Sequence, residues 1–172
     1  KLFKFVNIGH QSYLTEKSNL ELINKLFHDA IRLGEVRNDI KKIEPILRDT
    51  DFVSFDMGSI RQSDAPGYFR PNPNGFHSEE ACQIARYSGT SDLVRIFGVF
   101  ETNPKLDNNN HTSALAAQMI WYFIDGLESR SIEIPEVGNS NYKTFIVTHS
   151  DLDYDMTFYK SMLTERWWLE VP

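Results

Sequence analysis

Cysteine, clustered basic residues and long apolar runs are scarce or missing in this 172-residue sequence. The single cysteine, Cys82, excludes an intrachain disulfide and is typical of a reducing compartment, so we expect a cytoplasmic protein. No apolar run approaches the roughly 18 residues that span a bilayer, so we expect no membrane partner. Lysines and arginines are scattered and the net charge is −6, which argues against a nucleic-acid partner. A glycine-rich phosphate loop is also missing.

The residues that are present are typical of a globular protein. Hydrophobic residues make up 41% of the chain and charged residues 24%. We expect a single domain over residues 1–172, with a core at 1–128 and a C-terminal extension at 129–172 that carries strand-like segments. The chain opens at Lys1 directly in an apolar stretch, so we expect further sequence upstream.

Strand and helix patterns alternate along the chain. Apolar runs at residues 3–8, 51–56 and 93–100 predict buried strands, and apolar residues at helical spacing predict helices at 18–33, 79–88 and 112–127. Ser18 and Glu21 suggest a capping box for the first helix, and Gly34 its end. A shorter helix is predicted from about residue 38, and Pro45 either limits it or marks a break in it. Residues 57–75, rich in glycine, proline and asparagine, predict a long loop.

This alternation predicts an α/β fold whose mainly parallel sheet is covered by helices on both faces. The runs 3–8, 51–56 and 93–100 are expected to be neighbouring parallel strands. The tail adds strand-like segments at 143–148 and 152–159, followed by Trp167-Trp168.

Three polar residues follow the predicted strands directly or nearly so: His10, Asp56 and Glu101. Ligands of open parallel sheets bind beyond the carboxyl ends of the strands, so these side chains are candidates for one metal or cation site that opens onto a shared cleft. The alternative is that they cap neighbouring helices or face water.

Several segments in order carry a family resemblance. Residues 53–60, followed by Asp64-Ala65-Pro66-Gly67, resemble the ureohydrolase signature Ser-Phe-Asp-x-Asp and the Ala-Pro-Gly turn after it. Residues 75–87 resemble the helix that follows in that family. Residues 99–104, with Asp107, resemble its Glu-Val-Asn-Pro segment, and residues 112–120 resemble the helix after that segment. The chain therefore resembles the C-terminal half of the ureohydrolase (arginase, agmatinase and formimidoylglutamase) family. Arg61 and Trp167-Trp168 are most similar to a formimidoylglutamase-like branch from Bacteroidetes.

The resemblance implies a three-layer α/β/α arginase-like fold, a small-molecule linear amidine substrate, and two Mn²⁺ ions in full-length relatives. If upstream sequence is missing, the apolar sheet edge beside residues 3–8 is uncovered and tends to pair with another chain, so we expect a homo-oligomer. By resemblance Asp56 matches the first aspartate of the metal-binding pair, and Glu101 matches the glutamate that holds the cationic amidine end of the substrate. Gly58 stands where the second aspartate is expected, and the family's upstream His-x-Asp-x-His-x-Asp segment is not found in this chain. We therefore expect this chain alone to bind no metal and to be inactive. Two hypotheses stay open: a hydrolase of amidine C–N bonds, and a non-catalytic relative that binds a ligand or a partner.

Other candidates have simpler interpretations. His149, Asp151, Asp153 and Asp155 would share one face of a strand and could bind a divalent ion, but a solvated strand face explains them better. His28 is expected at the rim of a helix, His77 in a loop, and His111 in local structure before a helix. Cys82 is expected to be a buried structural thiol.

Overall fold

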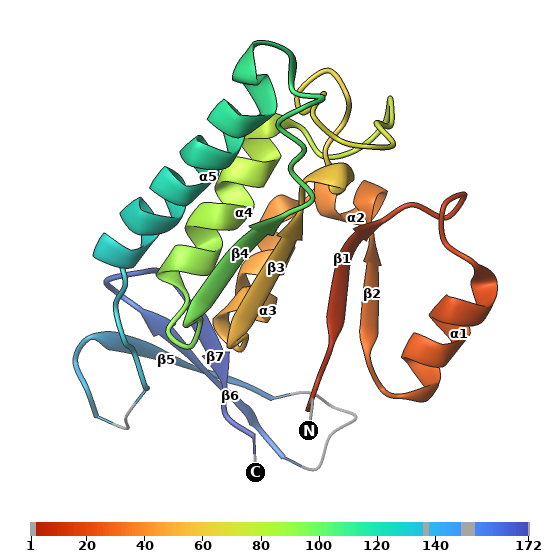
Figure 1. The fold of residues 1–172 in the computed structure, drawn as a ribbon. Coiled ribbons are helices and arrows are strands. Elements are labelled where there is room, and N and C mark those ends of the chain that lie inside the picture. The colour runs from red at the N-terminus through yellow and green to blue at the C-terminus, as the bar shows by residue number, and fades with distance from the viewer. Residues whose placement is uncertain (1–2, 136–137, 149–153, 172) are drawn as a thin grey trace. The chain divides into compact units, whose positions relative to one another are not determined.

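The computed structural model describes residues 3–135, 138–148 and 154–171. The chain divides into two compact units, Lys1–Arg130 and Ser131–Pro172. The first unit holds a pair of two-stranded parallel sheets, and the second holds a three-stranded antiparallel sheet (Figure 1). The candidate residues Asp56 and Glu101 both belong to the first unit.

The first parallel pair contains a strand that the sequence pattern did not reveal. Strand β1 (Val6–His10) pairs with β2 (Asp29–Arg32), and helix α1 (Lys17–Lys25) connects them. The predicted helix over 18–33 is therefore wrong in its second half. The helix ends because Phe27 adopts a left-handed φ of 57°, and Ala30 and Ile31 then pair with β1.

The predicted ends of that helix are also wrong. Glu16 is the N-cap residue of α1 and makes no side-chain capping bond, so Ser18 and Glu21 form no capping box. Gly34 does not terminate a helix but lies inside α2 (Leu33–Asn38). A 3₁₀ helix, η1 (Ile40–Ile43), and the short helix α3 (Glu44–Arg48) follow. Pro45 lies in the first turn of α3, where no proline N–H is needed, and so marks the break between η1 and α3.

The second parallel pair confirms two of the predicted strands. Strand β3 (Phe52–Asp56) runs parallel to β4 (Ile96–Phe100), with Phe52 opposite Ile96 and Asp56 opposite Phe100. Strand β1 was expected as a third neighbour, but it hydrogen-bonds to β2 in a separate sheet. Two long helices accompany the pair: α4 (Ser78–Thr90) after β3 and α5 (His111–Glu128) after β4. Short 3₁₀ turns precede them, η2 (Met57–Ser59) and η3 (Asn108–Asn110).

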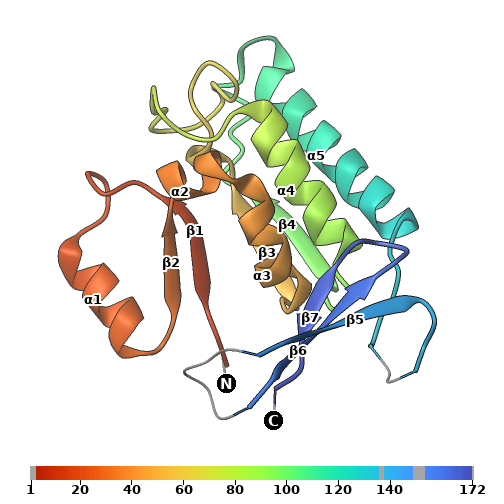
Figure 2. The same cartoon turned by 180° about the vertical axis from the view of Figure 1, so that it is seen from behind.

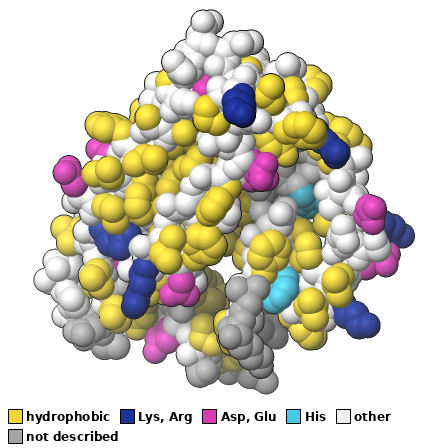
Figure 3. Space-filling model, viewed as in Figure 1, with side chains coloured by type: hydrophobic (Ala, Val, Ile, Leu, Met, Phe, Trp, Pro, Cys, Tyr) yellow, Lys and Arg dark blue, Asp and Glu magenta, His cyan; other side chains and the backbone are white. Residues whose placement is uncertain are grey.

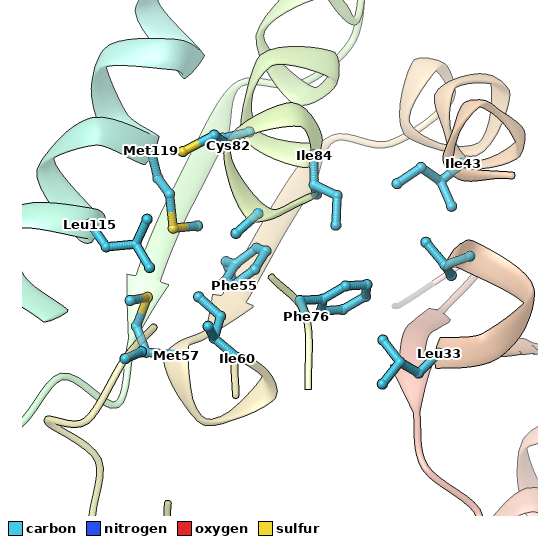
Figure 4. Packing of buried hydrophobic residues seen from close by; sticks show 14 of the residues in the cluster. Leu33, Ile43, Phe55, Met57, Ile60, Phe76, Cys82, Ile84, Leu115 and Met119 are labelled. Carbon is cyan, nitrogen blue, oxygen red and sulfur yellow. The ribbon is translucent and has the colours of Figure 1, made fainter. Parts of the chain in front are cut away.

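The core lies between the β3–β4 pair and the helices α3, α4 and α5, which cover one face of it (Figure 2). Phe55, Met57, Ile60 and Phe76 are buried there against Met119 and neighbouring side chains (Figure 4). The opposite face of the pair is exposed and apolar (Figure 3), with Phe52, Ile96 and Phe100 on it. The alternation of exposed and packed residues along β3 therefore places Asp56 on the face away from the helices.

Helices α4 and α5 approach each other at two glycines. A Cβ added to Gly89 would lie 2.2 Å from the carbonyl oxygen of Phe123, and one added to Gly126 would lie 2.4 Å from that of Arg86. The two backbones touch directly at this crossing. Gly89 and Gly126 both lie in the last turns of their helices, so the closest contact is at the C-terminal ends of α4 and α5.

The second unit contains β5 (Tyr142–Val147), β6 (Met156–Ser161) and β7 (Trp167–Leu169) in an antiparallel meander. Both carboxylate oxygens of the buried Glu133 accept hydrogen bonds, from the Ser161 and Thr164 hydroxyls. Strands were expected close to these positions; β6 begins at Met156, and residues 152–153 of the second expected strand lie outside the described residues. None of the helices in the described ranges is long and apolar enough to cross a membrane.

Candidate functional site

Asp56 and Glu101 lie at the carboxyl ends of adjacent parallel strands. Asp56 is the last residue of β3 and is opposite Phe100, the last residue of β4, and Glu101 follows directly. Neighbouring strands are about 4.8 Å apart, so the two acidic residues start from nearly the same point of the sheet rim. Both residues are exposed.

Asp56 is held by local hydrogen bonds in an extended conformation, whereas Glu101 has an unusual backbone geometry. Oδ1 of Asp56 accepts a hydrogen bond from the Gly58 N–H at 2.7 Å, and the Ser59 hydroxyl donates to the Asp56 carbonyl oxygen at 2.6 Å. Glu101 has a left-handed φ of 62°, which non-glycine residues rarely adopt. Such outliers cluster at functional sites, which supports a role for Glu101 beyond packing.

Tyr68 is a member of this rim that sequence reasoning missed. Burial raises the pKa of its hydroxyl, and the charges of Asp56 and Glu101 raise it further, while Arg70 opposes them. Burial and the two negative charges therefore both favour the protonated phenol. The sequence gives no signal for this placement, because it depends on how the loop after η2 folds back.

The Tyr68 ring lies against Gly58. A Cβ at position 58 would come within 2.4 Å of the Tyr68 Cζ atom and 2.7 Å of both Cε atoms. These distances are far shorter than carbon–carbon contacts of about 3.5–4.0 Å. The position at which the ureohydrolase pattern has its second aspartate is therefore filled by an aromatic ring.

His10 does not join the two carboxylates in a metal-binding group. It ends β1, where it pairs with Arg32, and its Nδ1 atom is buried with no hydrogen-bond partner among the described residues. Within the described ranges, no three histidine, cysteine, aspartate or glutamate side chains come together as metal ligands. The expectation that His10, Asp56 and Glu101 converge on one metal site is therefore wrong.

Asp64, part of the signature-like segment, anchors the loop to α4. Its buried carboxylate accepts hydrogen bonds from Arg61 Nε at 2.7 Å and from the backbone N–H of Ser78 at 2.8 Å, and also from the Ser63 hydroxyl. Burial opposes the charged form, but these hydrogen bonds dominate and lower the pKa of Asp64 to about 2. Asp64 thus supplies a negative charge to the N-terminus of α4.

The start of α4 has a second set of bonds. Its N-cap residue is His77, whose N–H donates to the Glu80 carboxylate at 2.7 Å. The His77 ring contacts a guanidinium nitrogen of Arg61 at 3.2 Å. His77 therefore supports the helix start and lies outside the Asp56–Glu101 rim.

Asp107 plays the same part for α5. Its buried carboxylate accepts hydrogen bonds from the backbone N–H groups of Thr112 and Ser113, both at 2.8 Å, and from the Ser113 hydroxyl at 2.7 Å. Burial again opposes ionisation, and the hydrogen bonds again dominate, so the pKa of Asp107 is lowered to about 2. Asp64 and Asp107, which lie outside the rim, therefore each hold the start of a helix.

The loop that carries Tyr68 is clamped between these anchors. The Gly67 N–H donates to the Thr112 hydroxyl at 2.7 Å, and the Gly67 carbonyl accepts from the Asn103 N–H at 2.9 Å. A Cβ on Gly67 would lie 2.7 Å from the Asp107 Cβ, so only glycine fits this approach. Gly67, directly before Tyr68, is therefore held through both its N–H and its carbonyl oxygen.

The remaining candidates lie elsewhere. His28 follows α1, where its ring contacts Phe5 and accepts a bond from the Phe5 N–H. His111 is the first residue of α5. Cys82 is buried in α4, and burial raises the pKa of its thiol, which disfavours a nucleophilic thiolate. Most of the 149–155 motif lies outside the described residues.

An open cavity of about 680 Å³ lies beneath α2 and contains neither Asp56 nor Glu101. Its lining includes Ile31, Arg32 and Val36. The expectation that the two carboxylates share one cleft stays a prediction.

Comparisons with known proteins agree with the resemblance. The model of the arginase family matches residues 1–125. The chain is 32% identical over 103 residues to the formimidoylglutamase of Bacillus subtilis, covering 58% of this chain and 32% of that protein. It is 36% identical over 95 residues to the formimidoylglutamase of Staphylococcus haemolyticus, covering 54% of this chain and 30% of that protein.

The fold matches solved structures as well. Trypanosoma cruzi formiminoglutamase, solved with Mn²⁺, superposes with a TM-score of 0.70 at 23% identity, over 74% of this chain and 46% of that one. At this identity the likeness shows the arginase-like fold alone. The aligned part thus spans about a third of the curated relatives and under half of the solved chain. Because the family match covers most of the first unit and includes both rim residues, the chain belongs to the arginase family.

Proposed function

We propose that this chain supplies the substrate-binding rim of a hydrolase that cleaves C–N bonds of linear amidines of the formimidoylglutamate, arginine or agmatine type. Glu101 would hold the cationic amidine end, and Asp56 would be a metal ligand in the full-length protein. The observation that carries the proposal is the placement of Asp56 and Glu101 at the ends of two hydrogen-bonded parallel strands.

The chemistry of an amidine suits this rim. An amidinium group is planar and positively charged, with two N–H donors that a carboxylate accepts side by side. Glu101 is exposed, and within the described part of the chain no lysine or arginine forms an ion pair that would compete for its oxygens. Its role is to bind and orient the cation, while Tyr68 and the loop around it border the same rim.

The residues described here do not fit the pair of Mn²⁺ ions found in full-length relatives. Asp56 brings one carboxylate, whose Oδ1 atom already accepts the Gly58 N–H. Position 58 has no side chain, and the Tyr68 ring fills the space beside it. A hard cation needs several oxygen or nitrogen donors, so we propose that the chain alone holds no dinuclear centre and hydrolyses no amidine.

Two measurements on the chain test these statements. Calorimetric titration with formimidoylglutamate and agmatine should show binding, and Glu101→Gln should abolish it. Glu79→Gln, a matched change at an exposed residue of α4, should leave the binding intact. Equal binding by wild type and Glu101→Gln would remove Glu101 from the proposal. Elemental analysis after dialysis with an ammonia-release assay should show neither manganese nor turnover. Near-stoichiometric manganese with turnover would overturn the proposed inactivity.

A second candidate is a non-catalytic family member that binds a ligand or a partner. Gly58 and the ring of Tyr68 favour it, because they remove one carboxylate from the family's metal pair. The native protein at its full length separates the two. Manganese with hydrolysis supports the enzyme, whereas Glu101-dependent amidine binding without metal or turnover supports the second candidate. We also propose a homo-oligomer, which light scattering of the same sample would measure.

A further inference from the structure

The contact between Tyr68 and Gly58 leaves no room for a side chain at position 58 while the Tyr68 ring keeps its place. Three atoms of the Tyr68 ring lie within 2.7 Å of the place where a Cβ would stand, and the nearest is the ring's far end, Cζ. An aspartate there would put its whole carboxylate into the volume of the phenol. The two side chains therefore compete for one space.

Neither backbone is free to retreat from this contact. Gly58 is tied to Asp56 by the 2.7 Å hydrogen bond from its N–H, and Met57 beside it is fully buried in the core. Gly67, the neighbour of Tyr68, is bound through its N–H to Thr112 and through its carbonyl to Asn103. Relief must come from rotation of the Tyr68 ring, which is only half-buried.

We propose that the Tyr68 ring closes the second carboxylate position of this rim, so that Gly58 and Tyr68 form a mutually dependent pair. Two linked features separate the chain from a site for two metal ions: position 58 lacks the aspartate, and the Tyr68 ring fills the space of its side chain. Restoring aspartate at position 58 is then not sufficient to restore that position, since the ring must also be removed. This inference concerns packing and does not depend on the proposed hydrolysis.

A double-mutant cycle tests the dependence directly. Gly58→Ala, Gly58→Asp, Tyr68→Ala and the two double variants are compared with wild type by denaturant unfolding. Each change at position 58 raises the unfolding equilibrium constant by some factor. That factor should be about ten times larger with Tyr68 present than with alanine at position 68. Repulsion between Asp56 and a carboxylate introduced at position 58 occurs in both backgrounds, so it cancels in the cycle.

Two controls separate the ring from other effects. Gly34 has no atom within 4 Å of an added Cβ, so Gly34→Ala should be additive with Tyr68→Ala. Tyr68→Phe retains the ring without its hydroxyl, so the cost of Gly58→Ala should stay as high as in wild type. A cost that falls with phenylalanine would assign the effect to the hydroxyl and contradict the proposal.

Additive unfolding free energies at positions 58 and 68 would overturn the inference. The outcome is distinct from a failure of the proposed function, because the unfolding cycle needs neither a substrate nor turnover.

Discussion

Replacing Asp107 with asparagine would test whether the buried acid before α5 holds the start of that helix. Oδ1 accepts from the Thr112 N–H, while Oδ2 accepts both the N–H and the hydroxyl of Ser113. Asparagine keeps the first acceptor but puts an NH₂ group where Oδ2 was. The N–H and the hydroxyl hydrogen of Ser113 then point at an amide group that is itself a donor.

The magnitude follows from these bonds. A hydrogen bond to a charged group contributes about 1.5–3 kcal/mol, and removal of an N-cap side chain costs about 0.5–2 kcal/mol. The Ser113 hydroxyl can turn and accept from the new amide, which recovers part of the loss. We expect Asp107→Asn to lower the free energy of unfolding by about 2 kcal/mol at neutral pH.

Urea unfolding at pH 7 measures this loss, with Asp49→Asn as the matched control at an exposed residue. The control should change stability by less than about 0.5 kcal/mol. The carboxylate of Asp107 has its pKa lowered to about 2 in the folded chain. Its stabilisation is therefore present above about pH 4 and is lost as the pH falls toward 2, so the two variants should converge in acid. Equal stabilities of the two variants at pH 7 would refute the anchoring role.

Two further predictions concern the same unit. Asp64→Asn should flatten the dependence of the unfolding free energy on pH between about pH 4 and pH 2, because the pKa of Asp64 is lowered to about 2 in the fold and its charged form is the stabilising one. Unfolding curves at several pH values measure this dependence, and an unchanged slope would contradict the prediction. Gly126→Ala should destabilise the chain by about 1–3 kcal/mol, because its Cβ would lie 2.4 Å from the Arg86 carbonyl oxygen and force α4 and α5 apart. Gly34→Ala in α2 is its control by thermal unfolding and should be neutral or stabilising, since nothing lies within 4 Å of its Cβ.

The sequence predicted those parts of the fold in which local pattern and tertiary packing agree. Strands β3 and β4 and helices α4 and α5 were expected close to their observed bounds, because each has its own apolar periodicity. Strand β2 was missed because it has four residues, and Ala30 and Ile31 continue the helical spacing of α1. Only pairing with β1 makes this segment a strand, and pairing is invisible in a single sequence.

The site shows the same division. The rule for strand ends located Asp56 and Glu101, since it needs only the order of strands. Tyr68 was missed because its contact with Gly58 joins residues on either side of an irregular loop. Asp64 and Asp107 were noticed through the resemblance, but their capping roles were not, because each lies several residues before the helix that it holds.

The left-handed backbone of Glu101 sets a trade-off between stability and function. An ordinary residue in this conformation costs about 1–2 kcal/mol relative to glycine, so Glu101→Gly would relax the chain while removing the carboxylate. A selection for thermal stability alone would therefore favour loss of the rim charge. Asparagine, which tolerates the same conformation better than alanine, is the substitution that changes charge with least effect on the backbone. Directed evolution of this protein for robustness would need a binding screen in parallel to retain Glu101.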